Sequence, residues 1–148
     1  MTMRRIPVLF MLLMLVAAAR AQKSIETLKA EAAKASGGRQ AKVYSELAES
    51  LVDFANDQFN QGESVKAHAT VHEILDYASK AHDGALSSKD NRKEVEIHLR
   101  NTQRHLESVK RTLAADDRPD LDAVEKKLEQ FRQDLLDAMF APPKKDGK

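Results

Sequence analysis

The stretch VEIHLRNTQRHLESVKRTLAADDRPDLDAVEKKLEQFRQDLLDAMF, from Val95 to Phe140, decides the fold of this chain. It holds two series of apolar residues that recur every three or four positions, which keeps each series on one face of a helix. Pro119 separates them, and proline begins helices but is excluded from their interior. The stretch therefore predicts two long helices folded back on each other around residues 116–119. The first series is Val95, Leu99, Thr102, Leu106, Val109 and Leu113, and the second is Leu121, Val124, Leu128, Phe131, Leu135 and Ala138.

Three further helices are predicted before this hairpin. Residues 24–36 indicate a short helix, which Gly37-Gly38 should end, and residues 40–61 indicate a helix with the widest apolar arc in the chain. Residues 65–82 carry a narrow seam of small residues, and Gly84 should end that helix in a left-handed conformation. No alternating run of β-branched residues indicates a strand. We therefore predict an all-α fold of four long helices and one short N-terminal helix, arranged as an antiparallel bundle or as stacked helical hairpins.

The two ends of the chain differ from its centre. Residues 1–21 have the pattern of a signal peptide, because Arg4 and Arg5 precede an apolar run and small residues allow cleavage after Ala21. The run is shorter than the roughly 20 residues that span a bilayer. We therefore expect a secreted or periplasmic protein with no stable membrane anchor after cleavage. Residues 22–140 should form the helical domain, and residues 141–148 a disordered polar tail.

Composition excludes several classes of function. The chain has no cysteine, which excludes disulfides, thioether-linked haem and thiolate metal sites. Residues 1–21 hold three of the 24 basic residues and none of the 23 acidic ones, so 21 basic residues face 23 acidic ones in the rest. A nearly neutral protein has no overall attraction for nucleic acid or for an anionic membrane. Nucleic acid is therefore not expected as a partner.

Two histidines give the sharpest hypothesis for a site. His68 and His72 stand four residues apart, so they share a face of their helix and could chelate a metal ion. His98 and His105 lie on a flank of the next helix, and the sequence leaves open whether the two flanks meet. The glutamate that follows the first histidine of zinc proteases is replaced by Ala69. The other interpretation is that these histidines are half-buried residues at the edge of an apolar stripe.

A row of four basic residues lies on the fourth of the five predicted helices, the first helix of the hairpin, on the face opposite its apolar seam. It offers a site for phosphate, anionic lipid or an acidic partner. The alternative is an ordinary solvated face, because Glu96 and Glu107 interrupt the positive charge. The row consists of Lys93, Arg100, Arg104 and Arg111.

No catalytic machinery is visible in the sequence. The glycines form no phosphate-binding loop, and serines stand mainly at helix ends and in turns, where capping accounts for them. Acid–base catalysis by a carboxyl pair needs burial to displace the pKa values, and we expect no acid in an apolar seam. The chain is therefore predicted not to be an enzyme, and no cofactor is predicted.

Residues 44–81 resemble one tetratricopeptide-type helical hairpin. Gly62 stands in the turn between its helices, but the large aromatic residues of that family's second helix are missing, and no second copy follows at the 34-residue period. Residues 109–140, from VKRTL at 109–113 through Arg118-Pro119 to Phe140, also resemble a group of exported bacterial helical proteins without assigned function. The tetratricopeptide-like positions are Leu51, Ala55, Gly62, Ala67 and Ile74.

These observations favour an exported, non-enzymatic helical protein that acts as an interaction or scaffold module, with a protein partner or a second copy of itself. The alternative is a periplasmic metal-binding or metal-sensing bundle that uses His68 and His72.

Overall fold

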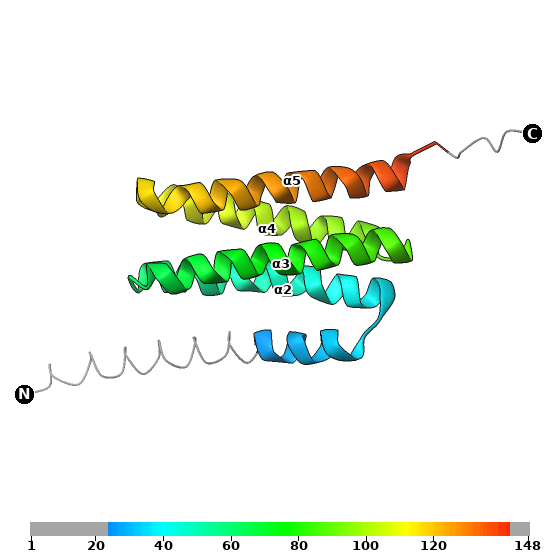
Figure 1. Cartoon of the computed structure of the whole chain (residues 1–148), viewed down its shortest axis with the longest axis horizontal. Helices are drawn as coiled ribbons and strands as arrows, with labels where there is room; N and C mark the ends of the chain where they lie inside the picture. Colours follow the sequence, from blue (N-terminus) through cyan, green and yellow to red (C-terminus); the bar gives the residue numbers. More distant parts are fainter. Residues whose placement is uncertain (1–23, 143–148) are drawn as a thin grey trace, which may run out of the picture.

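The computed structural model describes residues 24–142, and all regular structure in this part of the chain is helical (Figure 1). This confirms the all-α prediction of four long helices and one short N-terminal helix. The predicted signal peptide and residues 143–148 of the predicted tail lie outside the described residues. A helix over residues 24–34 is followed by α2 (Gly37–Asn60), α3 (Ser64–Ser88), α4 (Arg92–Thr112), the 3-10 helix η1 (Ala115–Asp117) and α5 (Arg118–Phe140).

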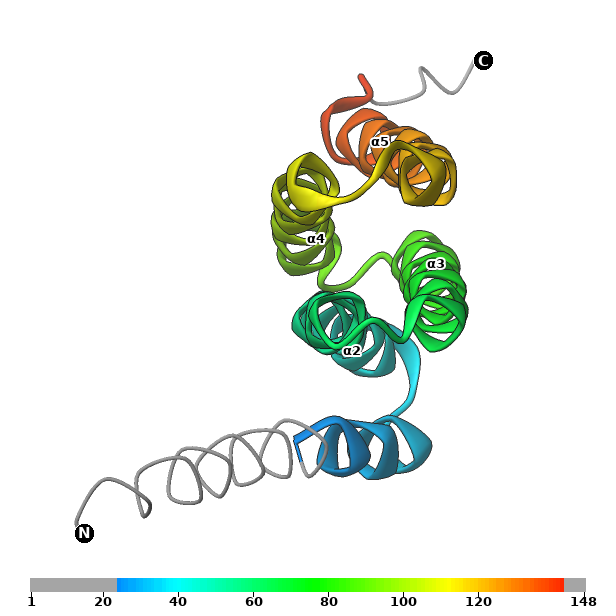
Figure 2. The same cartoon turned by 90° about the vertical axis from the view of Figure 1, so that its left-hand side faces the viewer.

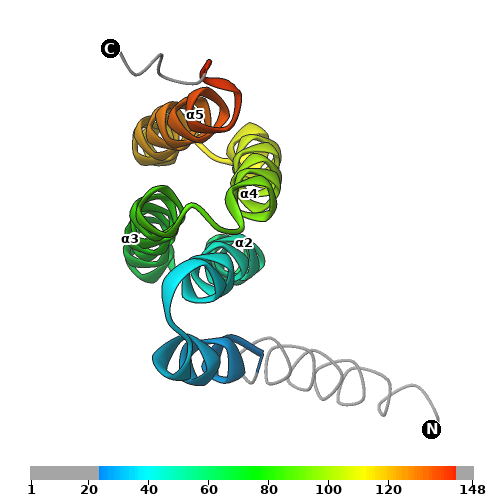
Figure 3. The same cartoon turned by 90° about the vertical axis from the view of Figure 1, so that its right-hand side faces the viewer.

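The four long helices form two antiparallel hairpins, one stacked on the other. α2 packs against α3, and α4 packs against α5. Across the boundary between the hairpins, α4 lies beside α2 and α5 lies beside α3 (Figures 2 and 3). The α2–α3 and α4–α5 connections are at the same end of the molecule (Figure 1), so the helices paired across the boundary run in the same direction. The architecture is thus a stack of hairpins, not a ring in which the last helix closes on the first.

α2 lies at the centre of this stack. It has α3 and α4 as neighbours, and the helix over residues 24–34 lies on its side away from α4 (Figure 3). That short helix is docked, since Ile25 and Ala32 are buried in the common core. The wide apolar arc of α2 is explained by these several partners, because a helix with one partner needs only a narrow stripe. Its fully buried apolar residues are Ala41, Val43, Leu47, Ala48, Leu51, Val52 and Ala55.

Gly84 does not end the third helix, and the prediction that it does is wrong. α3 continues to Ser88, and Lys89 takes the left-handed conformation after it, with φ of 63°. A Cβ atom on Gly84 would lie 3.0 Å from the Cβ of Ala41 on α2. The glycine therefore serves a close approach between two helices, which depends on the size of the side chains at the contact.

The first helix ends before the Gly37-Gly38 pair, as predicted, but the pair itself forms the beginning of α2. Gly38 is buried, and a Cβ atom there would lie 2.5 Å from the Cβ of Asp90 and 2.9 Å from its carbonyl oxygen. Asp90 belongs to the connection between the two hairpins. The absence of a side chain on Gly38 thus lets the first turn of α2 rest on that connection.

Replacing Gly38 with alanine should lower the free energy of unfolding by about 1–3 kcal/mol, because the added methyl group meets backbone atoms of Asp90. Urea denaturation of the full chain measures this. Gly62→Asn is the control, since no atom lies within 4 Å of its added Cβ and asparagine tolerates the positive φ of 76°. We expect a change within about 0.5 kcal/mol there. An equal loss in both variants would contradict the assignment.

Candidate functional site

The main candidate site is a cleft along the boundary between α2 and α4. It has a volume of 360 Å³, with α2 supplying most of its lining, α4 one wall and Leu28 of the N-terminal helix the other. A second cleft of 260 Å³ continues along the same boundary and shares Asp53 and His105 with the first. The lining of the first cleft is Leu28, Glu46, Glu49, Ser50, Asp53, His98 and His105.

Three carboxylates give this cleft its charge. Glu46, Glu49 and Asp53 follow each other at steps of three and four residues, so the helical repeat places them in one line along α2. We call the site that they line the acidic cleft. His98 reaches across from α4, with its Nδ1 2.6 Å from Glu49 Oε2 and its Nε2 3.7 Å from Glu46 Oε1. The arrangement suits a cationic ligand, because like charges focused in a concave site raise the local concentration of the opposite charge.

Another cleft, of 380 Å³, lies between the helix over residues 24–34 and the start of α2. Glu31 lines it together with Lys34 and Arg39, and Arg39 lies 3.7 Å from Glu31 in an ion pair. Its charges thus oppose one another. In the acidic cleft, Glu46 has an ion pair with Lys42 at 3.8 Å on the same helix, but no lysine or arginine is among the residues that line the cleft. The acidic cleft is therefore the better candidate, because its three lining carboxylates have one sign and follow one another along the helix.

His68 and His72 share a face of α3, as predicted from their spacing, and both point at Asp120 near the start of α5. His68 Nδ1 lies 3.0 Å from Asp120 Oδ2, and His72 Nε2 lies 3.6 Å from the same oxygen. The second ring nitrogen of His68 is 2.9 Å from Oδ1 of Asp117 in η1. Within residues 24–142, no group of three or more histidine, aspartate or glutamate side chains is arranged to hold a metal ion.

The two histidine flanks face different neighbours. Those of α3 turn toward η1 and α5, whereas His98 on α4 turns toward α2. His82, further along α3, pairs with Asp134 of α5 and not with another histidine. The four imidazoles considered from the sequence are therefore not gathered in one place. The rings of His68, His72, His82 and His98 instead form ion pairs with aspartate or glutamate carboxylates.

The row of basic residues on α4 is partly neutralised by its own helix. Arg100 donates hydrogen bonds to Glu96, and Arg111 donates one to Glu107. Lys93 and Arg104 are exposed, and neither forms an ion pair with another residue of the described chain. Two of the four basic residues of the predicted anion site, Lys93 and Arg104, are therefore available to an anion.

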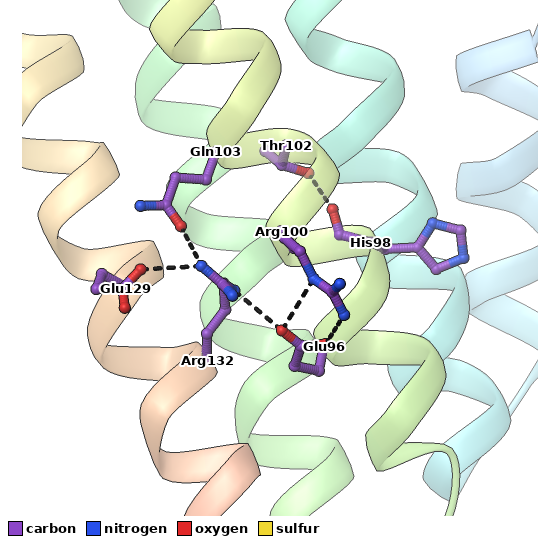
Figure 4. A network of polar contacts seen from close by, with 7 residues as sticks. All are labelled: Glu96, His98, Arg100, Thr102, Gln103, Glu129 and Arg132. Atoms are coloured by element: carbon purple, nitrogen blue, oxygen red, sulfur yellow. Dashed lines mark hydrogen bonds and ion pairs between the residues drawn. The ribbon is translucent and has the colours of Figure 1, made fainter.

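The environment predicted for Glu96 is wrong. This residue was assigned to the solvated face of α4, but it is 3% exposed and lies between α4 and α5 (Figure 4). Arg132 of α5 donates to Glu96 Oε1 at 3.1 Å and also binds Gln103 and Glu129. Burial raises the pKa of Glu96, but the hydrogen bonds and charges of Arg100 and Arg132 outweigh it and lower the pKa from 4.5. The neighbouring Ile97 is the partly exposed residue instead.

Comparisons with known proteins give no match: no protein-family model, no curated protein and no solved structure is significantly similar to the chain. The tetratricopeptide-like and exported-protein resemblances therefore remain predictions. None of the helices described here is long and apolar enough to cross a membrane.

Replacing Glu96 with glutamine should lower the free energy of unfolding at neutral pH by about 1–3 kcal/mol, because Arg132 loses the charge of its buried partner. A carboxyl group with a lowered pKa stabilises the fold above its ordinary pKa, and this contribution disappears as the pH falls through the lowered value. The difference between the variant and the original chain should therefore shrink as the pH falls below 4.5. Urea denaturation at several pH values measures it.

Glu107→Gln is the matched control. It also removes a carboxylate four residues before an arginine of α4, but both partners are largely exposed. Such pairs contribute little, so we expect a change within about 0.5 kcal/mol. If this variant loses as much stability as Glu96→Gln, the loss in Glu96→Gln does not come from the burial of Glu96 and its arginine partners.

Proposed function

We propose that this chain is an exported, non-enzymatic helical protein that binds a partner protein through the acidic cleft. The observation that carries the proposal is the line of Glu46, Glu49 and Asp53 along the cleft between α2 and α4. The ligand that fits this charge is a segment of chain rich in lysine or arginine. Export rests on the signal-peptide pattern of residues 1–21, which lie outside the described part of the structure.

The shape of the site supports an extended occupant. The acidic cleft and the 260 Å³ cleft that continues it follow the same helix boundary, from Glu46 and His98 at one end to Asn56 and Thr112 at the other. Apolar groups, including Leu28, Val52 and Val109, lie among the charges. A peptide that places basic side chains on the carboxylates and aliphatic groups on these residues would use both. Charge complementarity of this kind raises association rates and selects the partner.

The described contacts favour binding over catalysis. Nucleophilic catalysis needs a hydroxyl or thiol hydrogen-bonded to a base. The chain has no cysteine, and the hydrogen bonds of serine hydroxyls within residues 24–142, those of Ser45 and Ser88, join them to backbone groups. The rings of His68, His72, His82 and His98 contact carboxylates on neighbouring elements, which fits a role in holding helices together.

A short lysine-rich peptide with alternating leucines provides the test. Fluorescence anisotropy should show that it binds the full chain, and that the same peptide with glutamate in place of lysine does not. The combined variant Glu46→Gln, Glu49→Gln, Asp53→Asn should bind the basic peptide about tenfold or more weakly, a loss of roughly 1.4 kcal/mol or more.

The control variant changes the net charge equally but elsewhere. Asp76, Glu94 and Asp116 are exposed, lie outside the cleft and form no ion pair within the described residues. Replacing these three with their amides should alter affinity by no more than about twofold, since distant exposed charges are screened by salt. Equal weakening in both variants would show that only net charge attracts the peptide, and the proposal would fail.

A further inference from the structure

Three histidines of this chain have a carboxylate at both ring nitrogens, and the most buried of them is His82. Its side chain is 11% exposed, and its ring stacks on Phe131 of α5 with 4.6 Å between ring centres. Nδ1 lies 2.8 Å from Asp83 Oδ1 on its own helix, and Nε2 lies 3.0 Å from Asp134 Oδ2 on α5. Both contacts have hydrogen-bond geometry.

His68 also lies between two carboxylates, near the other end of α3, but only one of its two contacts has hydrogen-bond geometry. Its Nε2 is hydrogen-bonded to Asp117 of η1 at 2.9 Å, and its Nδ1 forms an ion pair with Asp120 of α5 at 3.0 Å. Asp120 is shared with His72, at 3.6 Å. The edge of the ring also contacts Phe59 of α2, with 5.3 Å between ring centres.

His98 is the third case, on the opposite side of the stack. It extends from α4 to α2, where Glu49 Oε2 lies 2.6 Å from Nδ1 and Glu46 Oε1 lies 3.7 Å from Nε2. His105, one heptad later on α4, is exposed and has no carboxylate within ion-pair distance among the described residues. It therefore provides a natural comparison.

The protonation state of the ring decides how these contacts act. A neutral imidazole has one N–H donor and one lone pair, so one of two flanking carboxylates would face a lone pair. The imidazolium ion donates from both nitrogens and adds a positive charge between two negative ones. Around His82, both ring nitrogens can donate a hydrogen bond to a carboxylate only when the ring carries two protons.

Each of these three histidines also has a contact that crosses between the two hairpins. His68 and His82 join α3 of the first hairpin to η1 and α5 of the second, and His98 joins α4 of the second to α2 of the first. We propose that His68, His82 and His98 form a proton-dependent clasp, which holds the two hairpins together more tightly in mildly acidic solution than in mildly alkaline solution.

The direction of the effect follows from linkage. Only the imidazolium ion is attracted by two carboxylates at once, so the contacts are strongest on the acidic side of the range in which histidine ordinarily titrates, about pH 6.5, and weaken as the pH rises through that range. The aspartates and glutamates must remain ionised, which ordinarily requires a pH above about 5. The clasp is therefore strongest in the interval between these limits.

Urea denaturation of the full chain between about pH 5.5 and pH 7.5 tests the proposal, because only histidine among the side chains ordinarily titrates there. The urea midpoint should fall as the pH rises. At a fixed urea concentration, the ratio of unfolded to folded molecules should rise several-fold, with a ceiling of about tenfold per pH unit for each linked proton. A midpoint that is constant or rises with pH would overturn the clasp.

Two variants localise the effect. His82→Gln should reduce the dependence of the midpoint on pH, and combining it with His68→Gln and His98→Gln should abolish most of it. Asp134→Asn keeps the His82 ring but removes its partner on α5. It should also reduce the pH dependence, and since Asp134 is 56% exposed the fold should tolerate it.

His105→Gln is the matched control and should leave the pH dependence as it is in the original chain. If His105→Gln flattens the profile as much as His82→Gln does, the effect does not come from the paired histidines, and the proposal fails. If Asp134→Asn has the pH dependence of the original chain, the carboxylate of α5 is not part of the clasp.

A direct measurement of the distance between the hairpins complements the urea denaturation experiments. The chain has no cysteine, so cysteines introduced at Gln61 and Ala115 can carry a pair of fluorescent labels. Both positions are exposed and lie in the connections at the same end of the two hairpins (Figure 1). At a urea concentration just below the midpoint, energy transfer between the labels should fall as the pH rises from about 5.5 to 7.5. Equal transfer at both pH values would count against a clasp between the hairpins.

Discussion

The fold depends on the burial of more than one side of α2. Leu47 and Leu51 are at most 1% exposed, as are Ala48, Val52 and Ala55, and together they cover too wide an arc for α3 alone. Burying a leucine side chain stabilises a fold by about 1.5–3 kcal/mol relative to leaving it in water. The first hairpin by itself would expose part of this surface. Packing of α4 on α2 covers it, and the second hairpin is thereby fixed to the first.

Much of this fold is predictable from periodicity, because a buried stripe must recur with the helical repeat. Most seam residues of the α4–α5 hairpin are buried as expected, with Leu113, Phe131 and Ala138 only partly buried, and Pro119 lies in the first turn of α5. The errors arise where a residue's role depends on its distance from another element. Gly84 and Gly38 have the composition of helix ends, but each serves a close approach to a chain segment about 40 or more residues away. Glu96 resembles a solvated charge until Arg132 is placed beside it.

The candidate site was less predictable for the same reason. Glu46, Glu49 and Asp53 have the spacing of any charged helix face, and only the neighbouring helices make that face the wall of a cleft. The shared face of His68 and His72 followed from their spacing of four residues. Their carboxylate partners did not, since η1 and the start of α5 lie about 50 residues further along the chain.

His98 connects the acidic cleft with the proton-dependent clasp, because the same two carboxylates serve both. Glu46 and Glu49 line the cleft and also flank the His98 ring. A cationic segment that binds these carboxylates competes with the imidazolium ion for them. Linkage between two binding events is reciprocal. If protonation of His98 lowers the affinity of the cleft for the segment, the bound segment lowers the affinity of His98 for the proton by the same factor. A partner that occupies the cleft would then weaken the α2–α4 contact of the clasp, while the His68 and His82 contacts on the opposite side of the stack would remain. Partner binding and hairpin packing are in this way coupled through one histidine.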